Sequence, residues 1–214
     1  VAGDEIRPGI IDASGSIRDL GGVVPDIDSE AISPEGLTLP AAMDPESLPR
    51  VKGEPALAAP VADPSKVVCI GLNYSDHAAE VGMEPPSEPI IFLKSSTAYT
   101  GPSGPVIKPP HSTKLDWEVE LVIFIGTEAS FVSEENAMQH VAGYAVGNDV
   151  SEREFQTERP GGQWTKGKSG DNFAPVGPWL VTKDEVPNPE TLSIWLEVNG
   201  KRVQDGTTST LIFG

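Results

Sequence analysis

Short apolar runs separated by turn residues recur along the chain from residue 66 onward. They are rich in Val and Ile and are bounded by Gly, Pro, Asn and Asp, which is typical of β-strands joined by turns. The pattern predicts a mainly β fold with a few helices, barrel-like or built of packed sheets. The predicted strands are residues 66–71, 89–94, 116–126, 141–146, 173–182 and 192–198, and Asn199-Gly200 predicts a tight hairpin turn after the last of them.

Helices are predicted in only a few places, and each is short. Cap residues favour helices over residues 33–39, 76–81 and 133–141. In the second of these, Ser75 is the expected N-cap and Gly82 the expected stop.

The first 61 residues differ from the rest, because they are rich in Asp, Ser, Pro and Ala and carry no catalytic pattern. A short hairpin, one helix and a Pro-punctuated linker are expected there. We therefore predict a small N-terminal α+β domain with its linker over residues 1–61, packed on a main domain over residues 62–214.

Three carboxylates are candidates for a metal site. Glu118 and Glu120 are two residues apart on a predicted strand, so both point to the same face. Asp149 follows the end of a second predicted strand and would join them if the two strands are neighbours. Carboxylates beside a buried apolar run favour a hard divalent cation with oxygen ligands. The spacing equally allows a solvated strand face with Asp149 capping a turn.

His77 and Glu80 are three residues apart on a predicted helix and therefore neighbours on one face. A carboxylate beside an imidazole raises its basicity, which suits a general base acting on water. A surface pair that stabilises a short helix fits the same spacing. Lys94, at the end of a predicted strand, is a candidate contact for an anionic substrate or an ordinary surface lysine.

Cationic and polar side chains follow Asp149 in the sequence. If the chain after it is helical, Arg153 and Gln156 share one face with Asp149. Lys168 lies in the stretch 164–171, which is predicted to be a Gly-rich loop and lacks the spacing of a phosphate-binding loop.

The overall charge narrows the range of partners. The net charge is -17, so nucleic acid and anionic membrane surfaces are not expected as partners. The one cysteine, Cys69, lies in an apolar run and excludes an intrachain disulfide, which predicts a reducing cytoplasm. No apolar run reaches the length of a membrane span.

Taken together, the motifs resemble those of the fumarylacetoacetate hydrolase family over roughly residues 66–214, and most closely the bacterial branch that includes 2,4-diketo-3-deoxy-sugar-acid hydrolases such as those of L-rhamnonate and L-fuconate breakdown. Members of the family continue for several more strands with a Thr-Gly-Thr-Pro-like segment that is absent here, so we expect that the sequence is truncated or that the domain depends on something outside it. The matching motifs are Gly71 to Glu80, Phe92 to Lys94, Asp116 to Glu120, Asn148 to Gln156, and Lys166 to Ser169.

The resemblance implies a distorted β-barrel-like roll of this family's type, a homodimer, and one Mg²⁺ or Mn²⁺ ion. The matched positions imply the metal ligands Glu118, Glu120 and Asp149, the water-activating pair His77 and Glu80 on a lid helix, the substrate-side and oxyanion-side groups Arg153, Gln156 and Lys168, and the pocket residue Lys94.

The expected activity is metal-dependent hydrolysis of the C–C bond of a 2,4-diketo acid, an acylpyruvate or a 2,4-diketo-3-deoxy-sugar acid, to pyruvate and a second acid. The partner is then a small anionic 2-oxo or 2,4-dioxo acid. Oxaloacetate decarboxylation, hydration and isomerisation of 2-oxo acids fit the same site, and a metal-binding structural module is the alternative without catalysis.

Overall fold

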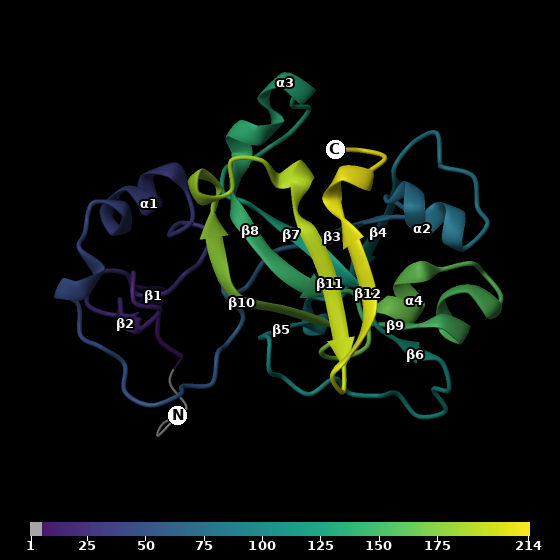
Figure 1. Cartoon of the computed structure of the whole chain (residues 1–214), viewed down its shortest axis with the longest axis horizontal. Helices are drawn as coiled ribbons and strands as arrows, with labels where there is room; N and C mark the ends of the chain where they lie inside the picture. Colours follow the sequence, from purple (N-terminus) through teal and green to yellow (C-terminus); the bar gives the residue numbers. More distant parts are fainter. Residues whose placement is uncertain (1–5) are drawn as a thin grey trace.

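The computed structural model describes residues 6–214, and its largest unit is a twisted four-stranded sheet in the order β5-β10-β8-β7 (Figure 1). Strand β8 lies at the centre and is antiparallel to both β7 and β10, while β5 runs parallel to β10. The bounds are β5 Tyr99–Thr100, β7 Val119–Ile125, β8 Val141–Asn148 and β10 Ala174–Thr182.

The remaining strands of residues 6–214 form four two-stranded antiparallel ladders. The mainly β fold with a few helices is confirmed. No closed barrel is formed by the strands that the structure describes, so the barrel-like roll stays a prediction. The ladders pair β1 Gly9–Ile11 with β2 Ile17–Asp19, β3 Val67–Gly71 with β4 Ile90–Lys94, β6 Leu115–Asp116 with β9 Ser151–Glu152, and β11 Ser193–Val198 with β12 Lys201–Thr207.

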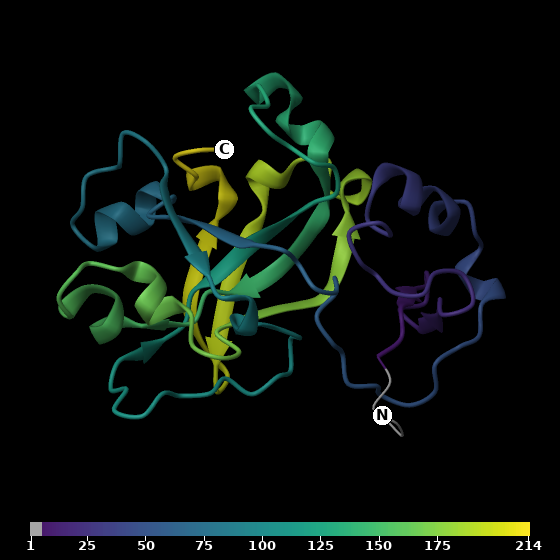
Figure 2. The ribbon, with the colours of Figure 1, turned by 180° about the vertical axis from the view of Figure 1, so that it is seen from behind.

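Helices are short and lie around the sheet, with α1 at one end of the molecule and α2 and α4 at the other (Figures 1 and 2). None of the helices within residues 6–214 combines the length and the apolar character that a bilayer crossing requires. Their bounds are α1 Pro34–Ala41, α2 Ser75–Glu80, α3 Glu134–Ala137 and α4 Trp164–Lys168, with a π-helical turn Glu154–Glu158 and 3-10 turns Pro45–Ser47, Ser96–Ala98, Met138–His140, Lys183–Glu185, Pro189–Thr191 and Thr208–Thr210.

Several local predictions are confirmed by the backbone. The predicted hairpin near the N-terminus is β1–β2, and the Ser33 hydroxyl caps α1 by accepting from the Gly36 N–H. Asn199 and Gly200 have φ values of 52° and 76°, and this left-handed pair is what a tight hairpin turn between β11 and β12 requires.

Other local predictions are wrong. The Gly-rich stretch at 164–171 contains helix α4 rather than only a loop. Helix α2 starts at Ser75 with Tyr74 as its N-cap, so Ser75 is not the cap. Ser133 is the N-cap residue of α3, as predicted, but its side chain accepts no capping N–H, and the helix is a single α turn followed by a 3-10 turn instead of one helix to residue 141.

The predicted strand over residues 116–126 is interrupted, which matters for the site. Residues 117 and 118 separate β6 from β7, so Glu118 stands at a break and Glu120 within β7. The prediction that this apolar run is buried is half wrong, because Phe124 is buried whereas Ile123 and Ile125 are 50% and 54% exposed. Alternation along the strand gives one packed face and one open face.

The core of the sheet includes the N-terminal segment. Ile32 and Val61 pack in one buried cluster with Phe124 of β7, Ala145 of β8 and Val176 of β10. Burial of such aliphatic side chains stabilises the fold by about 1.5–3 kcal/mol each. Residues before position 62 therefore cover one face of the central sheet.

The carboxylate of Glu152, in β9, forms hydrogen bonds that hold the loop preceding β6. Its side chain is fully buried, and its Oε1 accepts from the N–H groups of Thr113 (3.1 Å) and Lys114 (2.8 Å) and from the Ser112 hydroxyl (3.3 Å). Its Oε2 accepts from the Phe155 N–H at 2.8 Å. Burial alone raises the pKa of Glu152, but these donors outweigh it and hold the pKa below its usual range.

We expect Glu152→Gln to lower the free energy of unfolding by about 2–4 kcal/mol at pH 7, because an amide N–H₂ would face a backbone donor. The folded-state pKa is lowered, so the contribution of Glu152 is present above the unfolded-state pKa near 4.5 and fades as the pH falls through the folded-state value. Urea unfolding of both proteins at pH 7 and at pH 3.5 measures the difference, which should shrink at the lower pH.

The matched control is Glu158→Gln, which removes a half-exposed carboxylate that pairs with Lys114. It should change the free energy of unfolding by less than about 1 kcal/mol. Equal stabilities for Glu152→Gln and the native chain at pH 7 would show that the buried contacts of Glu152 do not hold this loop.

Candidate functional site

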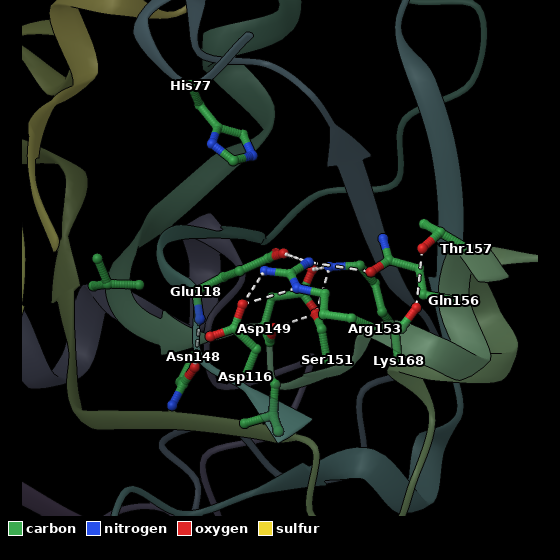
Figure 3. A network of polar contacts seen from close by, with 12 residues as sticks. His77, Asp116, Glu118, Asn148, Asp149, Ser151, Arg153, Gln156, Thr157 and Lys168 are labelled. Atoms are coloured by element: carbon green, nitrogen blue, oxygen red, sulfur yellow. Dashed lines mark hydrogen bonds and ion pairs between the residues drawn. The ribbon is translucent and has the colours of Figure 1, made fainter. Parts of the chain in front are cut away.

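The ammonium group of Lys168 joins two of the three predicted metal ligands (Figure 3). Its Nζ lies 2.7 Å from Glu118 Oε2, 2.7 Å from Asp149 Oδ2 and 2.8 Å from Ser151 Oγ. Lys168 is 2% exposed, and an ammonium group has three N–H donors, so all of them are used. The interpretation of Glu118 and Asp149 as solvated or turn-capping groups is therefore wrong.

Strand pairing places Glu118 beside Asp149. Val119 at the start of β7 is paired with Asn148 at the end of β8. The Glu118 N–H donates to Asn148 Oδ1 at 3.1 Å, and the Asp149 N–H donates to the Glu118 carbonyl at 2.8 Å. The break after β6 thus turns Glu118 toward the residue that follows β8.

A close approach of two helical turns places Lys168 under these carboxylates. A Cβ atom on Gly167 would lie 2.5 Å from the Gln156 backbone nitrogen and 2.6 Å from the Glu152 carbonyl oxygen. Only glycine lets α4 pack this tightly against the π-helical turn. Lys168, the next residue, is thereby buried.

Lys94 is a structural lysine at the floor of the same cluster. Its Nζ donates to the carbonyls of Val150 (3.1 Å), Lys168 (2.5 Å) and Phe173 (2.9 Å) and lies 2.6 Å from Asp149 Oδ1. Lys94 is 5% exposed, so the expectation of a surface lysine is wrong. Burial lowers the pKa of Lys94, and the charge of Asp149 opposes that shift.

These contacts leave one carboxylate oxygen without a hydrogen bond. The three donors of Lys94 point to backbone carbonyls, so Asp149 Oδ1 has the nearby positive charge but accepts no hydrogen bond. The ion pair with Lys94 at 2.6 Å is therefore what compensates the negative charge at this buried oxygen.

Arg153 connects the cluster to its polar edge. Its Nε and Nη2 lie 2.9 and 2.8 Å from Asp116 Oδ2, and its Nη1 contacts Glu118 Oε1 and, at 3.1 Å, Gln156 Oε1. Burial lowers the pKa of Arg153, but the neighbouring carboxylates outweigh it and raise the pKa above its ordinary value. Asp116 was not among the predicted site residues, although its motif was.

The expectation that Asp149, Arg153 and Gln156 share one helix face is wrong. Strand β9 separates Asp149 from the π-helical turn, and it is the fold of this turn that brings Gln156 to Arg153. The three side chains still meet around Glu118 (Figure 3).

Glu120 is the third predicted ligand. Burial, together with the negative charges of Glu118 and Asp149, raises the pKa of Glu120 to about 8, and Lys168 and a hydrogen bond with Tyr74 partly offset this. The protonated form of Glu120 is therefore favoured more than that of an ordinary carboxyl group. Tyr74, beside Glu120, was not predicted. Tyr74 lies three residues before His77 in the same motif, and this position could have indicated Tyr74 as a site residue.

The donor groups fit a hard divalent cation. Glu118, Glu120 and Asp149 offer carboxylate oxygens, the ligand type that hard divalent cations prefer, and a cation would offset the repulsion that raises the pKa of Glu120. Within residues 6–214 no three His, Cys, Asp or Glu side chains form a ready metal cluster. In this structure the Lys168 ammonium, not a cluster of free carboxylates, stands between Glu118 and Asp149.

His77 and Glu80 form a pair at the rim, apart from the buried cluster. His77 Nδ1 lies 3.2 Å from Glu80 Oε2, and the two side chains are 45% and 77% exposed. In Figure 3 His77 lies over the network, with no marked contact to it. The geometry of the pair is as predicted, and its role in catalysis stays a prediction.

Comparison with known proteins places the chain in a family. Residues 66–214 match the family model described as fumarylacetoacetate (FAA) hydrolase C-terminal. A Burkholderia ambifaria relative with a general hydrolase assignment and no stated substrate is 54% identical over 207 residues, which are 97% of this chain and 73% of the relative.

Solved structures agree with that match. A fumarylacetoacetate hydrolase from Exiguobacterium antarcticum has a TM-score of 0.82 at 32% identity and covers 96% of this chain and 72% of its own. A 2-hydroxyhepta-2,4-diene-1,7-dioate isomerase from Mycobacterium marinum has a TM-score of 0.60 at 42% identity, over 69% of this chain and 53% of its own. This chain therefore belongs to the fumarylacetoacetate hydrolase family of enzymes.

Proposed function

We propose that the chain carries the site of a Mg²⁺- or Mn²⁺-dependent hydrolase that cleaves the C–C bond of a 2,4-diketo acid to pyruvate and a second acid. The substrate is an acylpyruvate or a 2,4-diketo-3-deoxy-sugar acid. The observation that carries the proposal is the buried cluster in which the Lys168 ammonium pairs with Glu118 and Asp149, with Glu120 close enough for the charges of these two carboxylates to raise its pKa. The protein is proposed to act as a cytoplasmic homodimer.

Local charge supports an anionic substrate in spite of the net charge of -17. The cations Lys94, Lys168 and Arg153 are all in contact with carboxylates of the cluster. A bound divalent ion would add two positive charges, which would favour ionisation of Glu120 and leave the centre positive toward an incoming carboxylate.

The protein groups have distinct roles in the proposed reaction. Glu118, Glu120 and Asp149 hold the cation, which supplies Lewis-acid chemistry when it is bound. Arg153, at the polar edge of the cluster, orients the 2-oxo acid end of the substrate, and Gln156 beside it stabilises the oxyanion together with Lys168. These contacts keep the reacting carbonyl in place during the chemical step.

His77 is the proposed general base. Glu80 holds its Nδ1, so Nε2 accepts a proton from water while the water oxygen forms a bond to the distal carbonyl carbon. The bond from that carbon to C3 then breaks, its electron pair forms the enolate of pyruvate, and a proton returns to C3. The products are pyruvate and the second acid.

Lys168 is the proposed donor to the oxyanion that forms at the distal carbonyl. Its three donors are used by Glu118, Asp149 and Ser151 in this structure. At least one of these contacts must therefore be released before Lys168 can donate to the substrate.

Isomerisation of a 2-oxo acid is the second candidate function, favoured by the similarity to the Mycobacterium marinum isomerase. It needs proton transfer without attack by water, so it makes no demand on His77 as a base for water. Decarboxylation of oxaloacetate fits the same cluster.

The function is tested by pyruvate release from a 2,4-diketo-3-deoxy-sugar acid, acylpyruvates, fumarylpyruvate and oxaloacetate, each with Mg²⁺, Mn²⁺ or a chelator. We expect pyruvate and a second acid from a diketo substrate, with the activity lost in chelator because no cation remains to polarise the 2-oxo acid. Release of pyruvate and CO₂ from oxaloacetate alone would replace hydrolysis by decarboxylation, and no turnover on the whole panel would refute the proposal.

Glu120→Gln should weaken Mn²⁺ binding at least about tenfold, because a neutral amide replaces a carboxylate ligand. Isothermal titration calorimetry measures the affinity directly, without a turnover assay. Glu128→Gln, an exposed carboxylate on the loop after β7, is the control and should bind Mn²⁺ like the native chain. Equal affinities for all three proteins would remove Glu120 from the ligand set.

His77→Ala should lower kcat about 10²–10⁴-fold, the range for loss of a general base. Mn²⁺ affinity and the free energy of unfolding should stay unchanged, because His77 is half exposed and has no contact with the cluster. His111→Asn is the control, since His111 is exposed and its φ of 65° is tolerated by Asn. Undiminished turnover by His77→Ala would exclude His77 as the base.

A further inference from the structure

The segment that leads into helix α2 is bound along its length by residues far away in the sequence. Tyr74 forms an antiparallel bridge with Leu211, and the Ile212 N–H donates to the Asn73 carbonyl at 2.8 Å. In Figure 1 the end of the chain lies next to α2, beyond β12. The backbone before His77 is thus paired like a short strand with residues 211 and 212.

The Asn73 side chain extends this pairing by one residue. Its Nδ2 donates to the Phe213 carbonyl at 3.0 Å, and its Oδ1 accepts from the Phe213 N–H at 2.8 Å. Both the amide nitrogen and the amide oxygen of Asn73 therefore form hydrogen bonds with the backbone of one residue that is 140 positions away in the sequence. Such a two-point contact fixes orientation as well as distance.

Two further side-chain contacts link Ser75 and Asp76, at the start of helix α2, to Thr210. The Ser75 hydroxyl donates to the Thr210 carbonyl at 3.1 Å, and the Thr210 hydroxyl lies within hydrogen-bond distance of both Asp76 Oδ1 (3.0 Å) and the Thr207 carbonyl (2.9 Å). Asp76 Oδ1 also accepts from the backbone N–H of His77 at 2.9 Å. The chain of contacts thus reaches the backbone of the proposed general base.

Helix α2 has few other means of fixing its position. It is six residues long, and Ala78 is its only buried residue. Isolated helices of this length are not stable in water, so tertiary contacts must hold them. The backbone before it also has a constrained conformation, because Leu72 has a φ of 51°.

We propose that Asn73 is a positioning residue: its carboxamide fastens the segment 73–76 to residues 210–213 and so sets where His77 stands relative to the buried cluster. The Asn73 side chain bonds the Phe213 backbone and not the cluster around Lys168, so it acts through the backbone that leads to His77. The inference rests on the proposed function of His77 for its effect on turnover, but the positioning itself does not depend on it.

The first test compares kinetics of Asn73→Ala and the native chain on the substrate found in the panel. We expect kcat to fall about 10–100-fold, because small displacements of a catalytic group have effects of this size. KM should change by less than about threefold and Mn²⁺ affinity by less than about twofold, since the cluster that binds both is not touched. A fall in Mn²⁺ affinity equal to the fall in kcat would overturn the proposal in favour of general disruption.

The second test needs no turnover and reports on position directly. The chain has three histidines, His77, His111 and His140, whose imidazole signals can be followed separately by NMR. In Asn73→Ala the His77 signal should shift or broaden while the other two stay unchanged. Amide hydrogens of α2 should also exchange at least about tenfold faster, because the helix is held less firmly.

The control is Asn136→Ala, which removes a carboxamide that donates to Ser133 Oγ at 2.8 Å on α3. It should leave the His77 signal, kcat and the exchange of α2 as in the native chain. If Asn73→Ala does not fold, Asn73→Asp decides by the same measurements, since it keeps the acceptor for Phe213 and loses only the donor.

The two proposals fail in different ways. Absence of turnover by the native chain on the whole panel refutes the proposed function, and the NMR and exchange measurements then decide the role of Asn73 alone. An unchanged His77 signal and unchanged exchange of α2 in folded Asn73→Ala refute the positioning role, whatever the activity of the native chain.

Discussion

The ion pairs of the buried Lys168 ammonium with Glu118 and Asp149 are the interaction on which the rest of the site depends. An isolated charge in this interior would be costly, and two adjacent carboxylates would repel each other. The positive charge of Lys168 compensates the negative charges of Glu118 and Asp149, and Lys94 adds a second positive charge beside Asp149. Strands β7 and β8 and helix α4 meet here, so the electrostatics of the site and the packing of the fold cannot be separated. Removal of one partner would leave an unpaired buried charge.

The cluster also explains how an acidic protein can have a centre suited to anions. The net charge of -17 is carried mainly by exposed side chains, whereas the interior pairs its carboxylates with Lys94, Lys168 and Arg153. Short-range contacts in a low dielectric dominate the local potential, and solvent screens the surface charges. At Glu120, burial together with the negative charges of Glu118 and Asp149 raises the pKa to about 8.

The site is divided between a rigid interior and an exposed rim. Lys94, Lys168 and Asp149 are buried and joined by many contacts, whereas His77 and Glu80 are exposed on a short helix. If His77 is the general base, as proposed, its exposed position on a short helix requires contacts that hold it in one place. The contacts of Asn73 with Phe213 provide such a link between the rim and a distant part of the chain.

The sequence by itself determined the approximate positions of the longer strands and the hairpin turn at Asn199-Gly200, because these follow from alternation and turn propensities read along a few residues, but not the break that sets Glu118 outside β7. Only the tertiary structure decided that β7 pairs with β8 in the register that sets Glu118 beside Asp149, and that Lys94 is buried. It also decided that Asn73 meets a residue 140 positions away. Register and long-range packing depend on the whole chain at once, so no local pattern contains them.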